Sequence, residues 1–206
     1  MDIRVKRRAT RLGLTAVLAL AGCTTVRSTE PNQTATEQLL ITTAIDHAAA
    51  ELKPAIPTGS KVFVDPQYFD AAGDSAPYPK YAMGAVRDEL LQEGAHLVAD
   101  RKSADIVVEP RSGAQSIDHD TFLIGIPKFS IPIPLSGGFD FPEIALFKRD
   151  RQTGVAKLAV TAYDAKDGAL ETSAGPDYGY SERTHRVILL LFSWTDTDAP
   201  PPGTDE

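Results

Sequence analysis

The chain has 206 residues, of which 42% are hydrophobic, and it carries a formal net charge of −7 at neutral pH. This acidic balance argues against binding to nucleic acid, or to an anionic membrane through charge, because both are polyanions. The single cysteine excludes a disulfide within the chain and a cysteine-based metal site. The length suits one domain with a substantial hydrophobic core.

Residues 1–22 have the three parts of a secretory signal peptide. Basic residues open the segment, an apolar run extends from Leu12 to Ala21, and small residues precede Cys23. The run is too short for a transmembrane helix, which needs about 20 residues. Cleavage between Gly22 and Cys23 would remove five basic residues and one acidic residue, so that the remaining 184 residues would have a net charge of −11.

The motif Leu20-Ala21-Gly22-Cys23 resembles the lipobox of bacterial lipoproteins. The resemblance implies that the Cys23 thiol receives a diacylglyceryl group, that the signal is cut after Gly22, and that the new amino group is acylated by a chain such as palmitate. Several acyl chains hold a protein on a bilayer far more firmly than one. The alternative is an ordinary cleaved signal. Thr24 stands where an aspartate would resemble an inner-membrane retention signal, which favours the periplasmic side of the outer membrane.

After the signal, we expect a lipidated tether over residues 23–36 and a single domain over residues 37–194. Thr34 and Glu37 have the spacing of a capping box. A helix should follow to about Leu52, because apolar residues recur there every three or four positions. A second helix is expected over residues 80–93, ended by Gly94.

Strands are expected where apolar or alternating segments lie between turn residues. They cover residues 61–64, 96–99, 105–109, 155–164, 169–174 and 184–194. Residues 164–168 form a hairpin turn, and residues 195–206 are expected to be a disordered tail. The sequence therefore predicts an α+β fold with two helices packed on a mixed, mostly antiparallel sheet of about four to six strands.

Residues 114–147 combine many apolar residues with prolines, which are excluded from helices and central strands. Such a segment can be an arm that covers the core, a contact with a protein partner or a second copy, or a loop that faces a membrane. The candidate contact residues are its large apolar side chains: Phe122, Ile126, Phe129, Ile131, Ile133, Phe139 and Phe141.

No catalytic residue is predicted, because no Gly-x-Ser-x-Gly, phosphate-loop or His-Glu-x-x-His motif occurs in the sequence. Asp118-His119-Asp120 is not expected to bind a metal, because alternation along a strand places His119 opposite the two aspartates. His47 is expected at the surface or at the edge of the core. We therefore expect neither an enzyme nor a cofactor other than the covalent lipid. An enzyme with an unrecognised site is the alternative.

The sequence also resembles a family of small uncharacterised bacterial lipoproteins. The similar segments are Cys23–Val26, Thr34–Leu40, Leu146–Gln152, Val155–Ala159, Asp164–Gly168 and Ser173–Pro176. The resemblance implies a role in the cell envelope without naming an activity. The expected partners are the membrane, through the lipid, and a protein partner or second copy.

A weaker likeness, at the level of fold, is to the periplasmic domain of curli-secretion-type lipoproteins. There too an Ala-Asp pair precedes a strand, as Ala104-Asp105 does here, and a late strand ends in a pattern similar to Tyr163–Gly168. That family builds outer-membrane pores from long amphipathic hairpins. The resemblance therefore implies an alternative function as a subunit of an outer-membrane secretion or pore assembly.

Overall fold

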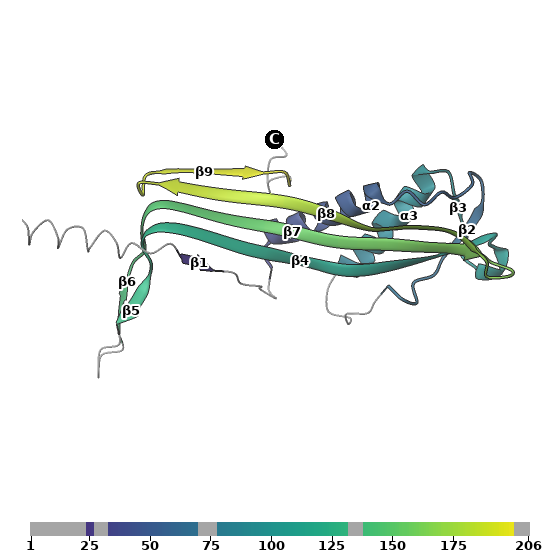
Figure 1. Ribbon diagram of the computed structural model, residues 1–206, viewed down its shortest axis with the longest axis horizontal. Helices are drawn as coiled ribbons and strands as arrows, with labels where there is room; N and C mark the ends of the chain where they lie inside the picture. The colour runs from purple at the N-terminus through teal and green to yellow at the C-terminus, as the bar shows by residue number, and fades with distance from the viewer. Residues whose placement is uncertain (1–23, 27–32, 70–77, 132–137, 200–206) are drawn as a thin grey trace, which may run out of the picture. The chain divides into compact units, whose positions relative to one another are not determined.

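The computed structural model describes residues 24–26, 33–69, 78–131 and 138–199 (Figure 1). The predicted signal peptide, its cleavage site and Cys23 lie outside the described residues. The elements are β1 (Thr24–Val26), α2 (Ala35–Glu51), β2 (Lys61–Val64), α3 (Tyr78–Gln92), β3 (His96–Leu97), a short 3-10 helix η1 (Arg101–Ser103), β4 (Ile106–Ile126), β5 (Phe129–Ile131), β6 (Phe139–Phe141), β7 (Ile144–Asp164), β8 (Leu170–Ile188) and β9 (Phe192–Thr197).

The main sheet follows the order β3-β2-β4-β7-β8-β9, and β1 pairs with β4 (Figure 1). Strand β2 is parallel to β3 and β4, whereas β1 is antiparallel to β4. Strands β7 and β8 form a hairpin through the predicted turn, in which the N–H of Asp164 donates to the carbonyl of Ala169. Two helices on a mixed sheet confirm the predicted α+β fold. Strands β5 and β6 form a separate two-stranded sheet.

The chain divides into two compact units, which we call unit 1 and unit 2. Unit 1 comprises residues 1–28, 119–151 and 184–196, and unit 2 comprises residues 29–118, 152–183 and 197–206. Strands β4, β7 and β8 each contribute residues to both units. Both helices and the main hydrophobic core belong to unit 2.

Helix α2 begins at the predicted capping box. The Thr34 hydroxyl accepts a hydrogen bond from the backbone N–H of Glu37 (3.3 Å), and the Glu37 carboxylate accepts from the backbone N–H of Thr34 (2.6 Å). These bonds satisfy two donors that a helix start leaves unpaired. The apolar face predicted for α2 is buried in full: Ile41, Ala44, Ile45, Ala48 and, just past the helix, Leu52.

Helix α3 also buries its predicted stripe, with one exception. Ala82, Val86 and Leu90 are buried, but Leu91 is half exposed, so the prediction was wrong there. The stripe is narrower than predicted because Leu90 and Leu91 are successive residues, about 100° apart on a helix. Gly94 adopts φ +92° after the helix, as its predicted role in ending α3 requires.

Helix α2 lies directly against the backbone of β7 and β8 at two glycines. A β carbon on Gly154 would come within 2.4 Å of the Leu40 carbonyl oxygen, and one on Gly179 within 1.8 Å of the Ala44 carbonyl oxygen. Any larger residue would push the helix off the sheet. His47 strengthens the same contact, because its Nδ1 lies 2.7 Å from the carbonyl oxygen of Tyr180 and donates to it.

The long strands differ from the predictions, which ended β4 too early at residue 109, began β7 too late at residue 155 and divided β8 into two segments. β4 runs on through Pro110, which is fully buried. The Val108 carbonyl accepts a hydrogen bond from the backbone N–H of Asp65. Even-numbered residues in this part of β4 therefore direct their backbone N–H and C=O groups towards β2, and β2 ends at Val64. The missing N–H of Pro110 therefore falls just past the end of β2, where no strand needs it.

Two predicted irregular segments are partly ordered, which corrects their boundaries. The tether of residues 23–36 contains β1, and α2 begins at Ala35. The tail predicted from residue 195 is wrong up to Ala199, since β9 continues to Thr197. The Asp198 carboxylate holds this end by accepting from the Ser181 hydroxyl (2.7 Å) and from the backbone N–H of Glu182 (2.6 Å).

The close approach of α2 to β8 predicts a large effect at Gly179. Gly179→Ala should lower the free energy of unfolding by about 2–3 kcal/mol, because the added methyl collides with the helix backbone. Gly84→Ala is the matched control, since a β carbon at Gly84 meets no atom within 4 Å. Alanine in the helix should raise the free energy of unfolding there by about 0.5–1 kcal/mol. Urea denaturation measures both, and equal effects would contradict the contact.

Candidate interaction surface

Unit 1 exposes most of its large apolar side chains. Among residues 119–131, 138–151 and 184–196, only Leu123, Ala145 and Thr184 are buried. Exposed apolar patches of this extent on a protein mark contacts with another molecule. The exposed large apolar side chains of unit 1 are Ile124, Ile126, Phe129, Ile131, Phe139, Leu146, Leu189, Leu190, Leu191, Phe192 and Trp194.

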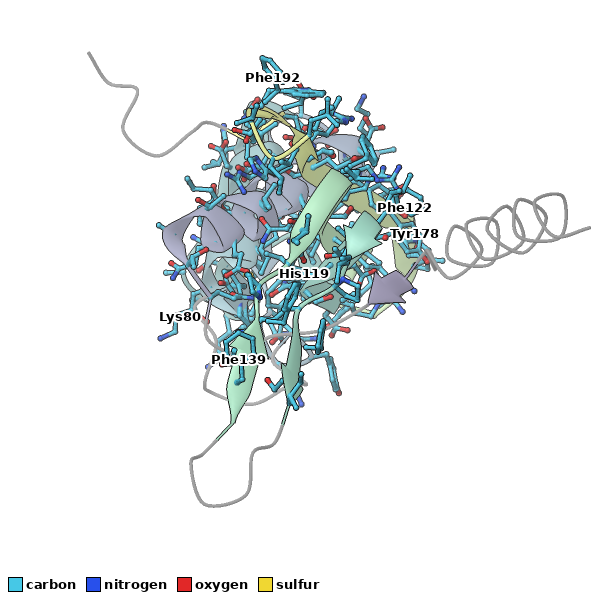
Figure 2. The ribbon with its side chains drawn as sticks, turned by 90° about the vertical axis from the view of Figure 1, so that its left-hand side faces the viewer. Lys80, His119, Phe122, Phe139, Tyr178 and Phe192 are labelled. Atoms are coloured by element: carbon cyan, nitrogen blue, oxygen red, sulfur yellow. The ribbon has the colours of Figure 1, made fainter. Side chains whose placement is uncertain are left out.

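Most of the predicted contact residues lie at or beside the β5–β6 ribbon, which is the antiparallel pair of Phe129–Ile131 with Phe139–Phe141. Phe129 lies opposite Phe141, and their rings stack with centroids 4.9 Å apart. Ile131 lies opposite Phe139, and both are exposed; Figure 2 labels Phe139 on this ribbon. Ile126, at the end of β4, is also exposed. Ile133 lies outside the described residues.

Phe122 differs from the other predicted contact residues, because it packs within unit 1. It is half-buried in β4. Its ring meets Phe147 edge to face, with centroids 6.1 Å apart, and the Arg149 guanidinium lies 6.0 Å from its centroid. Phe122 therefore supports the paired strands and leaves the ribbon as the exposed part of the predicted surface.

The structure adds a second exposed element, which we call the apolar turn: Leu189–Leu191 with the following Phe192. The continuous apolar run predicted that these residues lie inside a final strand over residues 184–194. That prediction was wrong at Leu189–Leu191, which link β8 to β9, whereas Phe192 is the first residue of β9. Leu189 and Leu190 have φ of +50° and +63°, and the N–H of Leu191 donates to the carbonyl of Ile188 over 3.2 Å. Two successive left-handed residues are typical of a type I′ turn, which favours Asn-Gly.

Several charged side chains in unit 1 are paired with one another. Lys148 lies 3.0 Å from a Glu143 oxygen and 3.3 Å from an Asp150 oxygen, and the Thr121 hydroxyl donates to Asp150 over 2.7 Å. Burial lowers the pKa of Lys148, but the hydrogen bond to Glu143 and the charges of both acids outweigh it and raise the pKa above its ordinary value. Lys148 therefore stays charged and paired.

In unit 2, the main group of interacting polar side chains surrounds Tyr163. Its hydroxyl donates to the Glu109 carboxylate over 2.7 Å, and the Arg101 guanidinium lies 5.5 Å from its ring centroid. Burial, followed by the hydrogen bond to Glu109, raises the pKa of Tyr163. A phenol with a raised pKa stays protonated at neutral pH and can therefore donate this hydrogen bond. This group therefore links β4 to β7.

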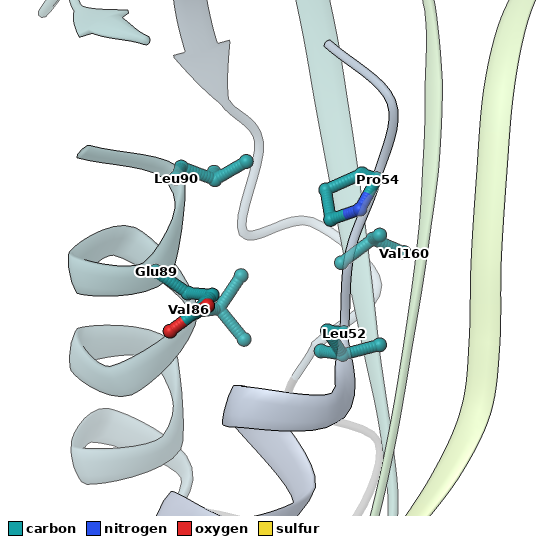
Figure 3. Close-up of a pocket in the computed structure, with 6 residues that line it drawn as sticks. All are labelled: Leu52, Pro54, Val86, Glu89, Leu90 and Val160. Carbon is teal, nitrogen blue, oxygen red and sulfur yellow. The ribbon is translucent and has the colours of Figure 1, made fainter. Parts of the chain in front are cut away.

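Unit 2 also has shallow depressions among its described residues. One of about 190 Å³ is lined by Phe69, Lys80 (labelled in Figure 2) and three further residues. Another, of about 270 Å³, includes Arg111 and Lys157, but the Lys157 ammonium lies 5.3 Å from the centroid of the Tyr178 ring. A third region, between α3 and the chain after α2, is filled by its own side chains and leaves no room for water (Figure 3).

The search for a metal site covers only the described part of the chain. There, no three His, Cys, Asp or Glu side chains are grouped so that they would hold a metal ion. Asp118, His119 and Asp120 lie in β4. The expectation that their side chains would not converge on a metal assumed that they form part of a strand. No helix within the described ranges has the length and apolar character that crossing a bilayer requires.

The geometry defines an α+β protein whose most distinctive surface is apolar and lies in unit 1. The chain belongs to a family of unknown function, DUF6655, whose model matches residues 17–170. This confirms the coarser expectation of a family without an assigned activity. A comparison with curated proteins gives no match.

The raised pKa of Tyr163 predicts a loss of stability in alkali. A phenol whose pKa is raised by folding contributes stability below its ordinary pKa of about 10, and this is lost as the pH rises through the folded-state value. The free energy of unfolding should therefore fall as the pH rises above about 10, and less steeply in Tyr163→Phe. Urea denaturation across this range measures both.

Glu109→Gln is the matched control, because it keeps an acceptor while removing the charge that opposes ionisation of Tyr163. Tyrosinate absorbance should show a lower pKa for Tyr163 in this variant. Tyr78 and Tyr81 also have raised pKa values, from burial first and then from nearby carboxylates, so Tyr163→Phe should retain part of the slope. If the free energy of unfolding depended on pH equally steeply in Tyr163→Phe and in the wild-type protein, the raised pKa of Tyr163 would be contradicted.

Proposed function

We propose that the protein is a lipid-anchored component of the bacterial cell envelope, held on the periplasmic side of the outer membrane through Cys23. Its role is structural or interaction-based, and we assign no catalytic activity to it. The observation that carries the proposal is the complete motif Leu20-Ala21-Gly22-Cys23 behind a three-part export signal.

The position of β1 supports this proposal. Thr24 is bonded to Cys23 and pairs with Leu123 of β4, and Val26 pairs with Thr121. Because pairing begins at the residue after Cys23, acyl chains on Cys23 would leave unit 1 almost no free tether. Unit 1 would therefore lie at the membrane surface, and it is also the unit with little buried apolar area. An apolar surface held beside a bilayer can contact the lipid.

The open edge of β9 favours a second candidate function, as a subunit of an outer-membrane secretion or pore assembly. Among the described strands, β9 pairs only with β8, and every residue from Phe192 to Thr197 is exposed. Such an edge presents unpaired backbone groups to another chain. Native mass spectrometry of detergent-extracted protein separates the two candidates, since an assembly gives masses that are multiples of one chain.

The anchor predicts that Cys23→Ala abolishes the covalent attachment of lipid and firm retention in the outer membrane. The wild-type protein, expressed in a bacterial host, should sediment with the outer membrane, and its intact mass should exceed that of residues 23–206 by the mass of the added lipid. The Cys23→Ala protein should be free of lipid and should no longer be firmly held in the outer-membrane fraction, because the acyl chains supply the anchor.

Thr25→Ala is the control, because it changes a neighbouring residue outside the motif and should remain lipidated. A wild-type protein that is released into the periplasm without added mass would overturn the anchor. It would leave an exported protein with a free thiol at residue 23.

A further inference from the structure

We propose that the apolar turn, Leu189–Leu191 with Phe192, inserts into the interfacial layer of a phospholipid bilayer. This inference deepens the proposed function and rests on it for the orientation of unit 1. It assigns the turn a second, non-covalent membrane contact, in addition to the acyl chains on Cys23. A small apolar element at an interface binds in proportion to the apolar area that it buries.

The turn is as exposed as any apolar element of the described chain. Leu189 and Leu190 are each 57% exposed, Leu191 is 83% exposed and Phe192 is 65% exposed. Trp194 follows two residues later in β9, on the same side of the strand as Phe192. Tryptophan is enriched where protein meets the membrane–water interface, since its ring is apolar and its N–H is polar. Figure 2 labels Phe192 at the outer side of this hairpin.

The backbone of the turn supports a function, because its sequence opposes its conformation. The left-handed region is unfavourable for residues with a β carbon, and leucine offers no side-chain hydrogen bond to offset this. Leu189 and Leu190 both occupy it. The N–H of Leu189 donates to the Leu146 carbonyl over 2.8 Å, which holds the turn against β7. Strain that the surrounding structure maintains at exposed residues is a feature of binding sites.

The charges around the turn favour lipid as the occupant. No charged residue occurs between Val187 and Thr195, and the nearest charged pair, Arg186 with Asp196, is closed on itself. Insertion would therefore bury no charge. A second copy is a poorer occupant, because a stable protein interface takes about 20–30 residues from each side and the turn offers four.

The experiment uses the single tryptophan of the chain, Trp194, as a probe beside the turn. The protein is residues 23–206 with Cys23→Ala, which keeps every described residue and carries no lipid. We expect phosphatidylcholine vesicles to shift the Trp194 emission to shorter wavelength, and brominated lipid to quench it. Because insertion is apolar, the partition should persist at high salt, where attraction between charges is screened.

Two variants separate insertion from folding. Leu191→Ser should weaken the partition about tenfold or more, since moving one leucine side chain out of water accounts for at least that factor. Leu170→Ser is the matched control in unit 2, where Leu170 is 68% exposed, and it should leave the partition unchanged. The double variant Leu189→Asn/Leu190→Gly should unfold at higher temperature, because it supplies the residues that the turn favours, and should also bind vesicles more weakly.

The outcomes distinguish this inference from the proposed anchor. A vesicle response lost in Leu191→Ser and kept in Leu170→Ser supports insertion, even if wild-type protein from cells proves to carry no lipid. Folded protein that gives no Trp194 response overturns insertion and leaves the anchor standing. Self-association in lipid-free solution that Leu191→Ser abolishes, without any vesicle response, would instead assign the turn to a contact between copies and overturn the inference.

Discussion

Contact between the backbone of α2 and the backbones of β7 and β8 is the constraint on which the core of unit 2 depends. Gly154 and Gly179 remove the side chains that would keep the helix at an ordinary distance. On the helix side of the contact the residues are also small, namely Ala44 and Ala48. At this separation, the larger side chains of the helix and the sheet interlock on either side of the contact. Packing of this density tolerates little added volume, so the two glycines fix the spacing for every other core residue.

Much of unit 2 could be predicted because local signals agree there. The capping box of Thr34 and Glu37 starts α2, and three-four spacing of apolar residues identified its buried face. The length of the strands could not be predicted in the same way. In β4, residues 111–116 are exposed or half-buried and show no alternation, so no period marks them as strand. Pro110 also lies inside this strand, and a proline is acceptable there because β2 ends at Val64.

Of the candidate surface, the β5–β6 ribbon could be predicted from the sequence and the apolar turn could not. Prolines separate the β5–β6 ribbon from the long strands. Because proline is unfavourable inside a central strand, the apolar residues beside these prolines were predicted to form a contact surface. The apolar turn could not be recognised from the sequence, because a run of leucines lies far more often in a protein core than in an exposed turn. The turn is held by the strands on either side of it, since β8 pairs with β9 and His185 contacts Thr195 while Arg186 contacts Asp196 across the hairpin. The pairing of these flanking strands overrides the conformational preference of the leucines between them.

Uneven burial along continuous strands has a consequence in time. Strands β4, β7 and β8 each have one part in unit 2, which holds the main core, and another in unit 1, where few side chains are buried. Local opening is easiest where few apolar contacts must be broken. Amide hydrogens of a single strand should therefore exchange with solvent over very different times, from fast in residues 119–126 of β4 to slow near Val107 and Val108. The hydrogen-bonded ladder would then behave as a graded structure in which one part loosens while the other stays closed.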